Sequence, residues 1–275
     1  MLMIALDEQA IAHELISAYE AGQMVPQLPS SRPGFDLNSA YRVEAMLKSS
    51  RESAGHRAVG YKVGYGNKAM WRILKLETLV WAHLYEDTVH QTSDRAARLS
   101  IAHPRSLKIE PEIVFGMKKA MPAPDIDAVT ALEASEWLAL GFEIIDCPFP
   151  GWQFQPSDFV ASFGLHAALV IGERVSLESH RIPQLAEELA RFKVRMHKNS
   201  EFVEEGLGKN ALRSPASCLA ELGRATAKRF PDEVWSGREI VSTGTLTAGH
   251  LTQSGDRWRV EAEGLDVPPL SLELT

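Results

Sequence analysis

Hydrophobic residues recur along the chain with periods that change between those of helices and strands. Near the N-terminus, Ile11, Leu15 and Tyr19 fall on one helical face behind the capping residue Asp7, and Gly22 ends the segment. The same reasoning predicts helices at 36–55, 67–74, 126–140 and 214–230, strands at 58–64, 107–117, 142–147, 167–171, 240–242, 258–262 and 270–274, and a hairpin turning at 199–200.

Helices and strands follow one another too irregularly for a ladder of βαβ units. The pattern therefore predicts a strand-rich α+β fold. We expect residues 1–75 to form an N-terminal helical lobe and residues 76–275 to form the metal-binding catalytic core, the two making one integrated unit.

The composition is that of an ordinary folded protein. The 275 residues include 29 Lys and Arg against 36 Asp and Glu, a formal charge of -7, and 45% of them are apolar. This apolar content excludes a disordered chain. Basic residues are scattered, so no electrostatic surface for a phosphate backbone is expected, and nucleic acid is not a predicted partner.

Cysteine content and apolar runs bear on where the protein works. Cys147 and Cys218 are too few for a disulfide framework and suit a reducing compartment. The opening Met-Leu-Met-Ile-Ala-Leu stretch stops at Asp7 without a basic flank, and apolar runs fall far below the roughly 18 residues of a membrane span. We therefore expect a cytoplasmic protein without a membrane partner.

Two glutamates stand in one predicted strand. Side chains alternate along a strand, so Glu110 and Glu112 share one face while Ile109 and Ile113 occupy the other. A solvated acidic face is the simpler alternative, and Pro111 between them also suits an edge strand. The pair by itself leaves both a metal site and an exposed strand open.

A third glutamate, Glu143, lies in an apolar predicted strand, where an uncompensated charge is costly. A buried Arg or Lys would satisfy it, as would exposure at the start of the strand. If the three carboxylates converge without a His or Cys cluster, their oxygens select a hard cation, Mg²⁺ or Mn²⁺, over zinc.

These segments together resemble the fumarylacetoacetate hydrolase superfamily. The resemblance rests on the order of three motifs, Gly60-Tyr61-Lys62-Val63-Gly64, then Ile109-Glu110-Pro111-Glu112-Ile113-Val114-Phe115, then Phe142-Glu143-Ile144-Ile145-Asp146. Within the superfamily, the chain is most similar to the 2-hydroxypenta-2,4-dienoate (2-keto-4-pentenoate) hydratases and the 4-oxalocrotonate decarboxylases, over nearly its whole length. The resemblance implies a mixed β-sandwich or roll with flanking helices, in a homo-oligomer.

The resemblance also implies roles for individual residues. It makes Glu110, Glu112 and Glu143 the ligands of Mg²⁺ or Mn²⁺, and Lys62 a contact of the substrate or the reacting water. A second implied contact is the loop Thr243, Gly244 and Thr245, which would hold the substrate carboxylate. From the residues alone, Lys62 stays open between a solvated head group and a Schiff-base lysine, and the loop resembles any hydroxyl-rich turn.

Two segments depart from the family pattern. Val80 stands where the hydratases and decarboxylases carry an acid expected to be catalytic, and Ser162 and Phe163 stand where two polar residues are usual. The predicted replacements for the missing acid are Glu77 and His83, with Asp87 as a further candidate. His166 also lies near the altered segment, but a lone histidine among apolar residues is more often structural.

We therefore expect a metal-dependent hydro-lyase, a hydratase that adds water to a 2-hydroxy-dienoic or 2-oxo-enoic acid in the catabolism of aromatic compounds. The metal would stabilise the enolate that develops as the substrate ketonises. Three alternatives stay open: a decarboxylase using the same enolate, a hydrolase that cleaves a C–C bond of a dioxo acid, and a non-catalytic member that kept only the fold.

Overall fold

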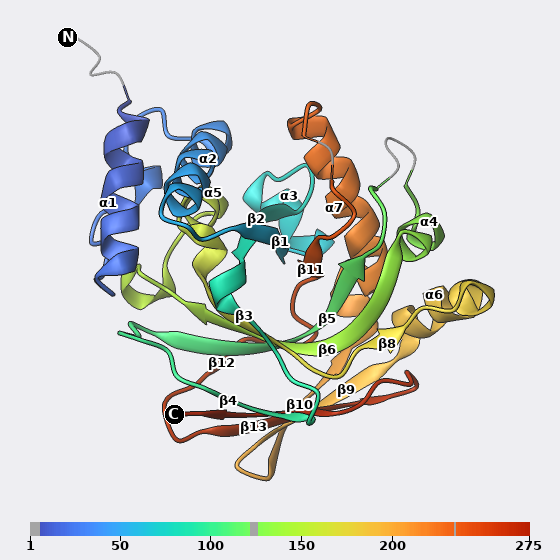
Figure 1. Ribbon diagram of the computed structural model, residues 1–275. Helices are drawn as coiled ribbons and strands as arrows, with labels where there is room; N and C mark the ends of the chain where they lie inside the picture. Colours follow the sequence, from blue (N-terminus) through green and yellow to red (C-terminus); the bar gives the residue numbers. More distant parts are fainter. Residues whose placement is uncertain (1–5, 122–125, 234) are drawn as a thin grey trace.

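The structure is a computed structural model that describes residues 6–121, 126–233 and 235–275. Two β-sheets lie one above the other, and helices cover the larger sheet on the side away from the smaller one (Figure 1). This architecture confirms the predicted strand-rich α+β roll with flanking helices. Over these described ranges, each helix is too short or too polar to cross a membrane.

The larger sheet is mixed and curled. Its strands are β1 (Ala58–Gly64), β2 (Val80–Tyr85), β3 (Val89–Gln91), β5 (Leu107–Met117), β6 (Ser135–Asp146), β7 (His166–Ile171), β8 (Val175–Ser176), β11 (Ile240–Ser242) and β12 (His250–Leu251). They run in the order β2-β1-β11-β5-β6-β7-β3, with β12 paired to β5 and β8 to β6. The short strand β11 is parallel to β1 and antiparallel to β5, so it stands between the strands that carry Lys62 and the predicted metal ligands.

The smaller sheet has five strands, which are β4 (Ala96–Leu99), β9 (Lys193–Lys198), β10 (Glu201–Leu207), β13 (Arg257–Glu263) and β14 (Leu270–Leu274). Their order is β10-β9-β13-β14-β4. The predicted hairpin is β9 and β10, and both turn residues, Asn199 and Ser200, have positive φ, as a tight hairpin turn requires. Trp258 and Val260 of β13 are buried while Arg257 and Arg259 are exposed, so the sheet has one packed face and one wet face.

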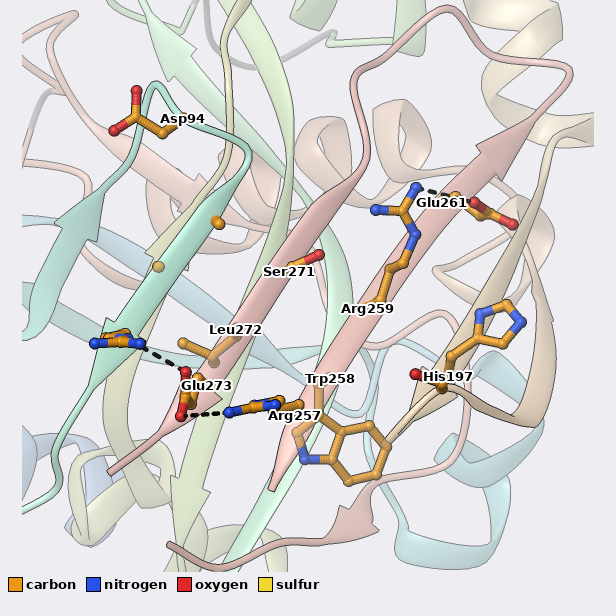
Figure 2. A pocket seen from close by; sticks show the side chains of 13 residues that line it. Asp94, His197, Arg257, Trp258, Arg259, Glu261, Ser271, Leu272 and Glu273 are labelled. Carbon is orange, nitrogen blue, oxygen red and sulfur yellow. Dashed lines mark hydrogen bonds and ion pairs between the residues drawn. The ribbon is translucent and has the colours of Figure 1, made fainter. Parts of the chain in front are cut away.

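The wet face of the smaller sheet carries a groove of about 800 Å³ (Figure 2). Most of its charged side chains are paired with one another. Arg98 and Arg257 both contact Glu273, and Arg259 contacts Glu261. These charges satisfy each other at the surface, and the one converging carboxylate group among the described residues lies instead in the larger sheet.

Local capping chemistry explains where most helices begin. The helices are α1 (Glu8–Glu20), α2 (Leu37–Ser53), α3 (Lys68–Leu74), α4 (Ala128–Glu133), α5 (Pro156–Ala161), α6 (Ile182–Arg191) and α7 (Pro215–Arg229). Asp7, Asp36, Asn67 and Ser214 each accept a hydrogen bond from a backbone N–H of the first turn that follows. These four predicted helix starts are confirmed.

The predicted helix over residues 126–140 is wrong. The segment forms only the short helix α4, capped by Asp127, and then enters β6, whose first half occupies residues 135–140. Asp125, the predicted start, lies outside the described residues. The error has a physical cause, because β6 lies between β5 and β7 and is buried on both faces, and a continuous apolar run does not distinguish a strand from a buried helix.

Candidate metal centre

Strand register brings the three predicted glutamates together. Glu110 of β5 stands directly opposite Glu143 of β6, and Glu112 follows two residues later on the same face. One carboxylate oxygen from each lies within 4.8 Å of those of the other two. Gly141, opposite Glu112, has no side chain and so makes room for Val114, since a Cβ there would lie 2.6 Å from Val114 Cγ2.

Glu112 is fully buried and only half satisfied. Its Oε2 accepts hydrogen bonds from the Ser242 hydroxyl and, at 2.8 Å, from the backbone N–H of Gly244. Its Oε1 is buried and accepts no hydrogen bond from any residue that the structure describes. A buried carboxylate oxygen normally has a partner, so this atom points to a ligand that is not part of the protein chain.

Glu143 is also fully buried, and its two oxygens face different groups. His166 Nδ1 lies 3.0 Å from Oε1, and Lys62 Nζ lies 2.9 Å from Oε2. Lys62 is itself buried and donates a hydrogen bond to the carbonyl oxygen of Gly164 at 2.9 Å. A Cβ on Gly164 would lie 2.6 Å from Lys62 Cδ, so the absence of a side chain there makes room for the lysine stem.

The carboxylates strongly influence one another's ionisation. Burial raises the pKa of Glu112 well above its ordinary value, and the charges of Glu143 and Glu110 raise it further. Burial also acts against ionisation of Glu143, but Lys62 and the hydrogen bond from His166 together lower its pKa. One ammonium group thus faces three carboxylates, and this excess of negative charge on oxygen ligands fits a hard divalent cation.

We expect metal affinity to rise with pH up to about pH 7. Burial raises the pKa of Glu110 from 4.5 to about 7, and a metal ion needs the ionised carboxylate, so binding below pH 7 must displace a proton. The stability of the metal-free protein depends on pH in the opposite direction. Because the folded state binds this proton more tightly than the unfolded chain, the contribution of Glu110 to stability is lost as pH rises from about 4.5 to 7.

Titration calorimetry with Mn²⁺ and thermal unfolding without metal, each repeated across this pH range, would check whether metal affinity rises and metal-free stability falls with pH. Glu110→Gln should make both profiles shallower, because the amide does not titrate, while the raised pKa of Glu112 keeps part of each pH dependence. A metal affinity of the wild-type protein that does not change between about pH 5.5 and 7 would contradict the prediction.

A cavity of about 510 Å³ opens beside the three carboxylates. Lys62 and Glu110 line it together with other polar residues such as Asn67 and Asn210, and its apolar lining is formed by Tyr65, Ile145, Trp152, Phe154, Phe159 and Leu165. Lys108, on the same face of β5 as Glu110, places its ammonium 4.0 Å from the centre of the Trp152 ring. The cavity therefore combines the charged groups of Lys62 and Glu110 with apolar side chains, and the Lys108 ammonium lies against one of these, Trp152.

The predicted substrate loop after β11 reaches this cavity with part of its length. Gly244 and Thr245 line the cavity, and the N–H of Gly244 is the group that binds Glu112. Thr243 is fully buried, and its hydroxyl donates to the carbonyl oxygen of Ile113 at 2.8 Å. The Thr243 side chain thus ties the loop to β5, and only the other two residues face the open space.

The structure does not bring Glu77 or His83 to this cavity. The side chain of Glu77 is 85% exposed and pairs with Lys228 at 3.2 Å. His83 lies on β2 next to Ala82, which is opposite Lys62, so its ring points to the other face, where Nδ1 lies 2.6 Å from Glu44.

The positions that depart from the family pattern also lie behind the cavity walls. Val80 is buried on β2 opposite Gly64. The Phe163 ring lies 4.5 Å from that of Tyr19, under α1, and the Ser162 hydroxyl donates to the carbonyl oxygen of Asp158 at 2.6 Å. None of these three side chains is among those that line the described cavity.

Three side chains outside the predicted site residues also contribute to the centre. His166 was expected to be structural, yet it contacts Glu143, and Ser242 binds Glu112. Lys108, a residue of the predicted strand 107–117, lines the cavity. Alternation along β5 could have placed Lys108 on the face of the glutamates, whereas the other two contacts depend on pairing between strands distant in sequence.

The fold and the three converging carboxylates agree with the resemblance to the fumarylacetoacetate hydrolase superfamily. No family model matches the chain. The chain is 27% identical over 251 residues to 2-hydroxyhexa-2,4-dienoate hydratase from Comamonas testosteroni, which covers 91% of this chain and 92% of that protein.

Two solved structures extend the comparison. The 4-oxalocrotonate decarboxylase from Pseudomonas putida G7, complexed with magnesium and adipate, superimposes with a TM-score of 0.86 over 99% of this chain and 100% of that one, at 23% identity. Fumarylpyruvate hydrolase from Pseudomonas aeruginosa, complexed with Mn²⁺ and pyruvate, superimposes with a TM-score of 0.56 over 79% of this chain and 89% of that one, at 16% identity. These comparisons confirm the resemblance to the hydratase and decarboxylase branch of the superfamily.

Proposed function

We propose that the protein is a divalent-metal-dependent hydratase that adds water to a 2-hydroxy-dienoic acid through its 2-oxo-enoic form. The observation that carries the proposal is the buried set of Glu110, Glu112 and Glu143, with an unpartnered Glu112 oxygen, beside a cavity of about 510 Å³. The likeness to a hydratase over 91% of the chain supports the same reaction class.

Mg²⁺ or Mn²⁺ is the cofactor that we propose for this chain. Among the residues that the structure describes, three carboxylates form the set without a nitrogen or sulfur ligand, which favours a hard cation that keeps positions for water and substrate. Magnesium and manganese are also the ions in the decarboxylase and hydrolase complexes that resemble the chain. When bound, the cation would stabilise negative charge on the substrate oxygens during ketonisation.

Lys62 is the residue that we propose to act on the substrate or the water. An ammonium group has three N–H donors. The Gly164 carbonyl accepts one and Glu143 lies beside a second, which leaves one for a carboxylate or a water molecule in the cavity. Because Lys62 is almost fully buried, its charge acts with little screening by solvent.

The remaining cavity residues would hold the organic part of the substrate. Gly244 and Thr245 line the space next to Lys62, where a substrate carboxylate would bind. Trp152, Phe154 and Phe159 supply an apolar wall for the conjugated carbon chain and exclude bulk water from it.

A decarboxylase is the second candidate, and Lys108 is the observation that favours it. Its half-buried ammonium forms no ion pair with an acid in the part of the chain that the structure describes, and it faces the cavity across Trp152. A second carboxylate on the substrate, as in a 4-oxalocrotonate-type acid, would satisfy this charge.

Product analysis tests the two candidates. The purified protein with Mg²⁺ should convert 2-hydroxypentadienoate or 2-hydroxyhexadienoate to the 4-hydroxy-2-oxo acid, and a chelator should abolish the reaction. Release of CO₂ from 4-oxalocrotonate, without hydration of the monocarboxylates, would favour the decarboxylase instead. Absence of both reactions, and of metal-dependent deuterium exchange at C3 of 2-oxopentanoate, would contradict an enzymatic role on these substrates.

A further inference from the structure

Behind Glu143 lies a buried polar chain that the proposed reaction does not use directly. His166, the first residue of β7, has a side chain that is 2% exposed, and its Nδ1 lies 3.0 Å from Glu143 Oε1. Its other ring nitrogen, Nε2, lies 3.0 Å from the Thr88 hydroxyl. Because an ionised carboxylate only accepts, the imidazole donates its Nδ1–H to Glu143 and meets the threonine on its far side.

A β-bulge places the histidine on this face of the sheet. Glu143 pairs with Leu169, and Ile144 with Ala168, but Ile145 pairs with His166, so β7 has one extra residue at this point. Without the extra residue, alternation would turn His166 to the opposite face from Glu143. Bulges of this kind re-aim a side chain and are frequent next to functional sites.

Thr88 is itself held from several directions. Its hydroxyl lies 3.0 Å from the carbonyl oxygen of Tyr85, and the neighbouring Asp87 pairs with Arg51 of α2 through both carboxylate oxygens at 2.8 Å. His56 also contacts Asp87, at 3.1 Å. The far end of the chain is therefore anchored to helix α2.

We infer that His166 and Thr88 are positioning residues that turn Glu143 into a one-oxygen ligand of the metal. His166 takes up Oε1, so Oε2, which lies 2.9 Å from Lys62 Nζ, is the oxygen left for the metal, and the carboxylate cannot turn both oxygens to Lys62. Groups that hydrogen-bond a metal ligand fix its orientation and support metal affinity. This inference rests on the metal centre of the proposed function and adds two residues to it.

A series of variants at position 166 separates the hydrogen bond from packing. Asparagine places an amide N–H near the position of Nδ1, whereas leucine fills the space without a donor. We expect His166→Leu to weaken Mn²⁺ binding, measured by calorimetry, by about 10–100-fold, and His166→Asn to retain most of the affinity. Thr88→Val, which removes the hydroxyl, should also weaken Mn²⁺ binding, whereas Thr88→Ser, which keeps the hydroxyl, should bind Mn²⁺ about as tightly as the wild type.

His83→Leu is the matched control, since it removes another buried histidine that pairs with a buried carboxylate, Glu44, on the opposite face of β2. It should leave Mn²⁺ affinity unchanged even if it lowers the melting temperature. The electron paramagnetic resonance spectrum of bound Mn²⁺ gives a second readout, which should change in His166→Leu and resemble the wild type in His166→Asn.

The outcomes distinguish this inference from the proposed function. Equal Mn²⁺ affinity and an unchanged Mn²⁺ spectrum in folded His166→Leu would overturn the inference alone, as would equal losses in the leucine and asparagine variants. If the wild-type protein binds Mn²⁺ and the variants at positions 166 and 88 show the expected order of Mn²⁺ affinities, the inference is supported whichever product the enzyme forms. A wild-type protein that does not bind Mn²⁺ would overturn the proposed function, and the inference with it.

Discussion

Replacing Glu112 by glutamine is expected to lower the affinity for Mg²⁺ or Mn²⁺ by more than the roughly 10–100-fold that loss of a ligand's hydrogen-bond partner costs. Turnover should fall with it. The reason is that the amide keeps an oxygen for the Ser242 hydroxyl and the Gly244 N–H but replaces the unpartnered Oε1 with a group that cannot ligate as an anion.

The same substitution should make the metal-free protein more stable. A buried carboxylate with one unpartnered oxygen, beside Glu110 and Glu143, opposes folding, and a neutral amide removes that repulsion. Each 1 kcal/mol gained should raise the melting temperature by about 2–4 °C. A fall in metal affinity together with a rise in metal-free melting temperature excludes simple misfolding as the cause.

Calorimetry and thermal unfolding of Glu112→Gln check both effects. Glu136→Gln is the matched control, since it changes an exposed glutamate of β6, and it should alter neither quantity. Unchanged metal affinity in Glu112→Gln would remove this residue from the centre.

Lys62→Met is expected to reduce turnover by about 10²–10³-fold, the usual cost of removing one preorganised donor from a buried site. Metal affinity should stay constant or rise, because Glu143 loses the ammonium that lies 2.9 Å from it. Methionine matches the length of the lysine stem, so packing against Gly164 is largely kept.

Steady-state kinetics and Mn²⁺ calorimetry measure the two effects, and Lys68→Met on the surface helix α3 serves as the control. Borohydride added with a 2-oxo acid should leave the mass of the wild-type protein unchanged, since the metal already serves as the electrophile. A reduced adduct on Lys62 would establish an imine mechanism, and wild-type turnover in Lys62→Met would deny the lysine a catalytic role.

Local chemistry made part of the fold predictable from the sequence. Asp7, Asp36, Asn67 and Ser214 cap their helices with contacts that span three residues or fewer, so the helix starts follow from short segments. The run after residue 134 was misjudged because its strand is covered on both faces, which removes the alternation that identifies a strand.

The candidate centre was predictable to the same local extent. Glu110 and Glu112 share a face by alternation alone, Glu143 stands out as a charge in an apolar strand, and the family resemblance made the three a ligand set. The contact between His166 and Glu143 depends on a one-residue bulge in the pairing of β6 with β7, which shifts the histidine to a face that alternation would not give it. The position of β11 between β1 and β5 joins residues about 180 apart in sequence, which no local pattern records.

The place of β11 has a consequence for the order in which the protein can mature during synthesis. Strands β1 and β2 form one hydrogen-bonded ladder and β5, β6 and β7 another, and the three residues of β11 join them. The ribosome makes these residues late, long after both ladders have emerged. Until then, Lys62 and the glutamates lie on separate ladders, and Glu112 lacks the partners supplied by Ser242 and Gly244. All three glutamates lie on the ladder of β5 and β6, so the surroundings of the carboxylates are completed last, and the carboxylate set itself does not depend on β11.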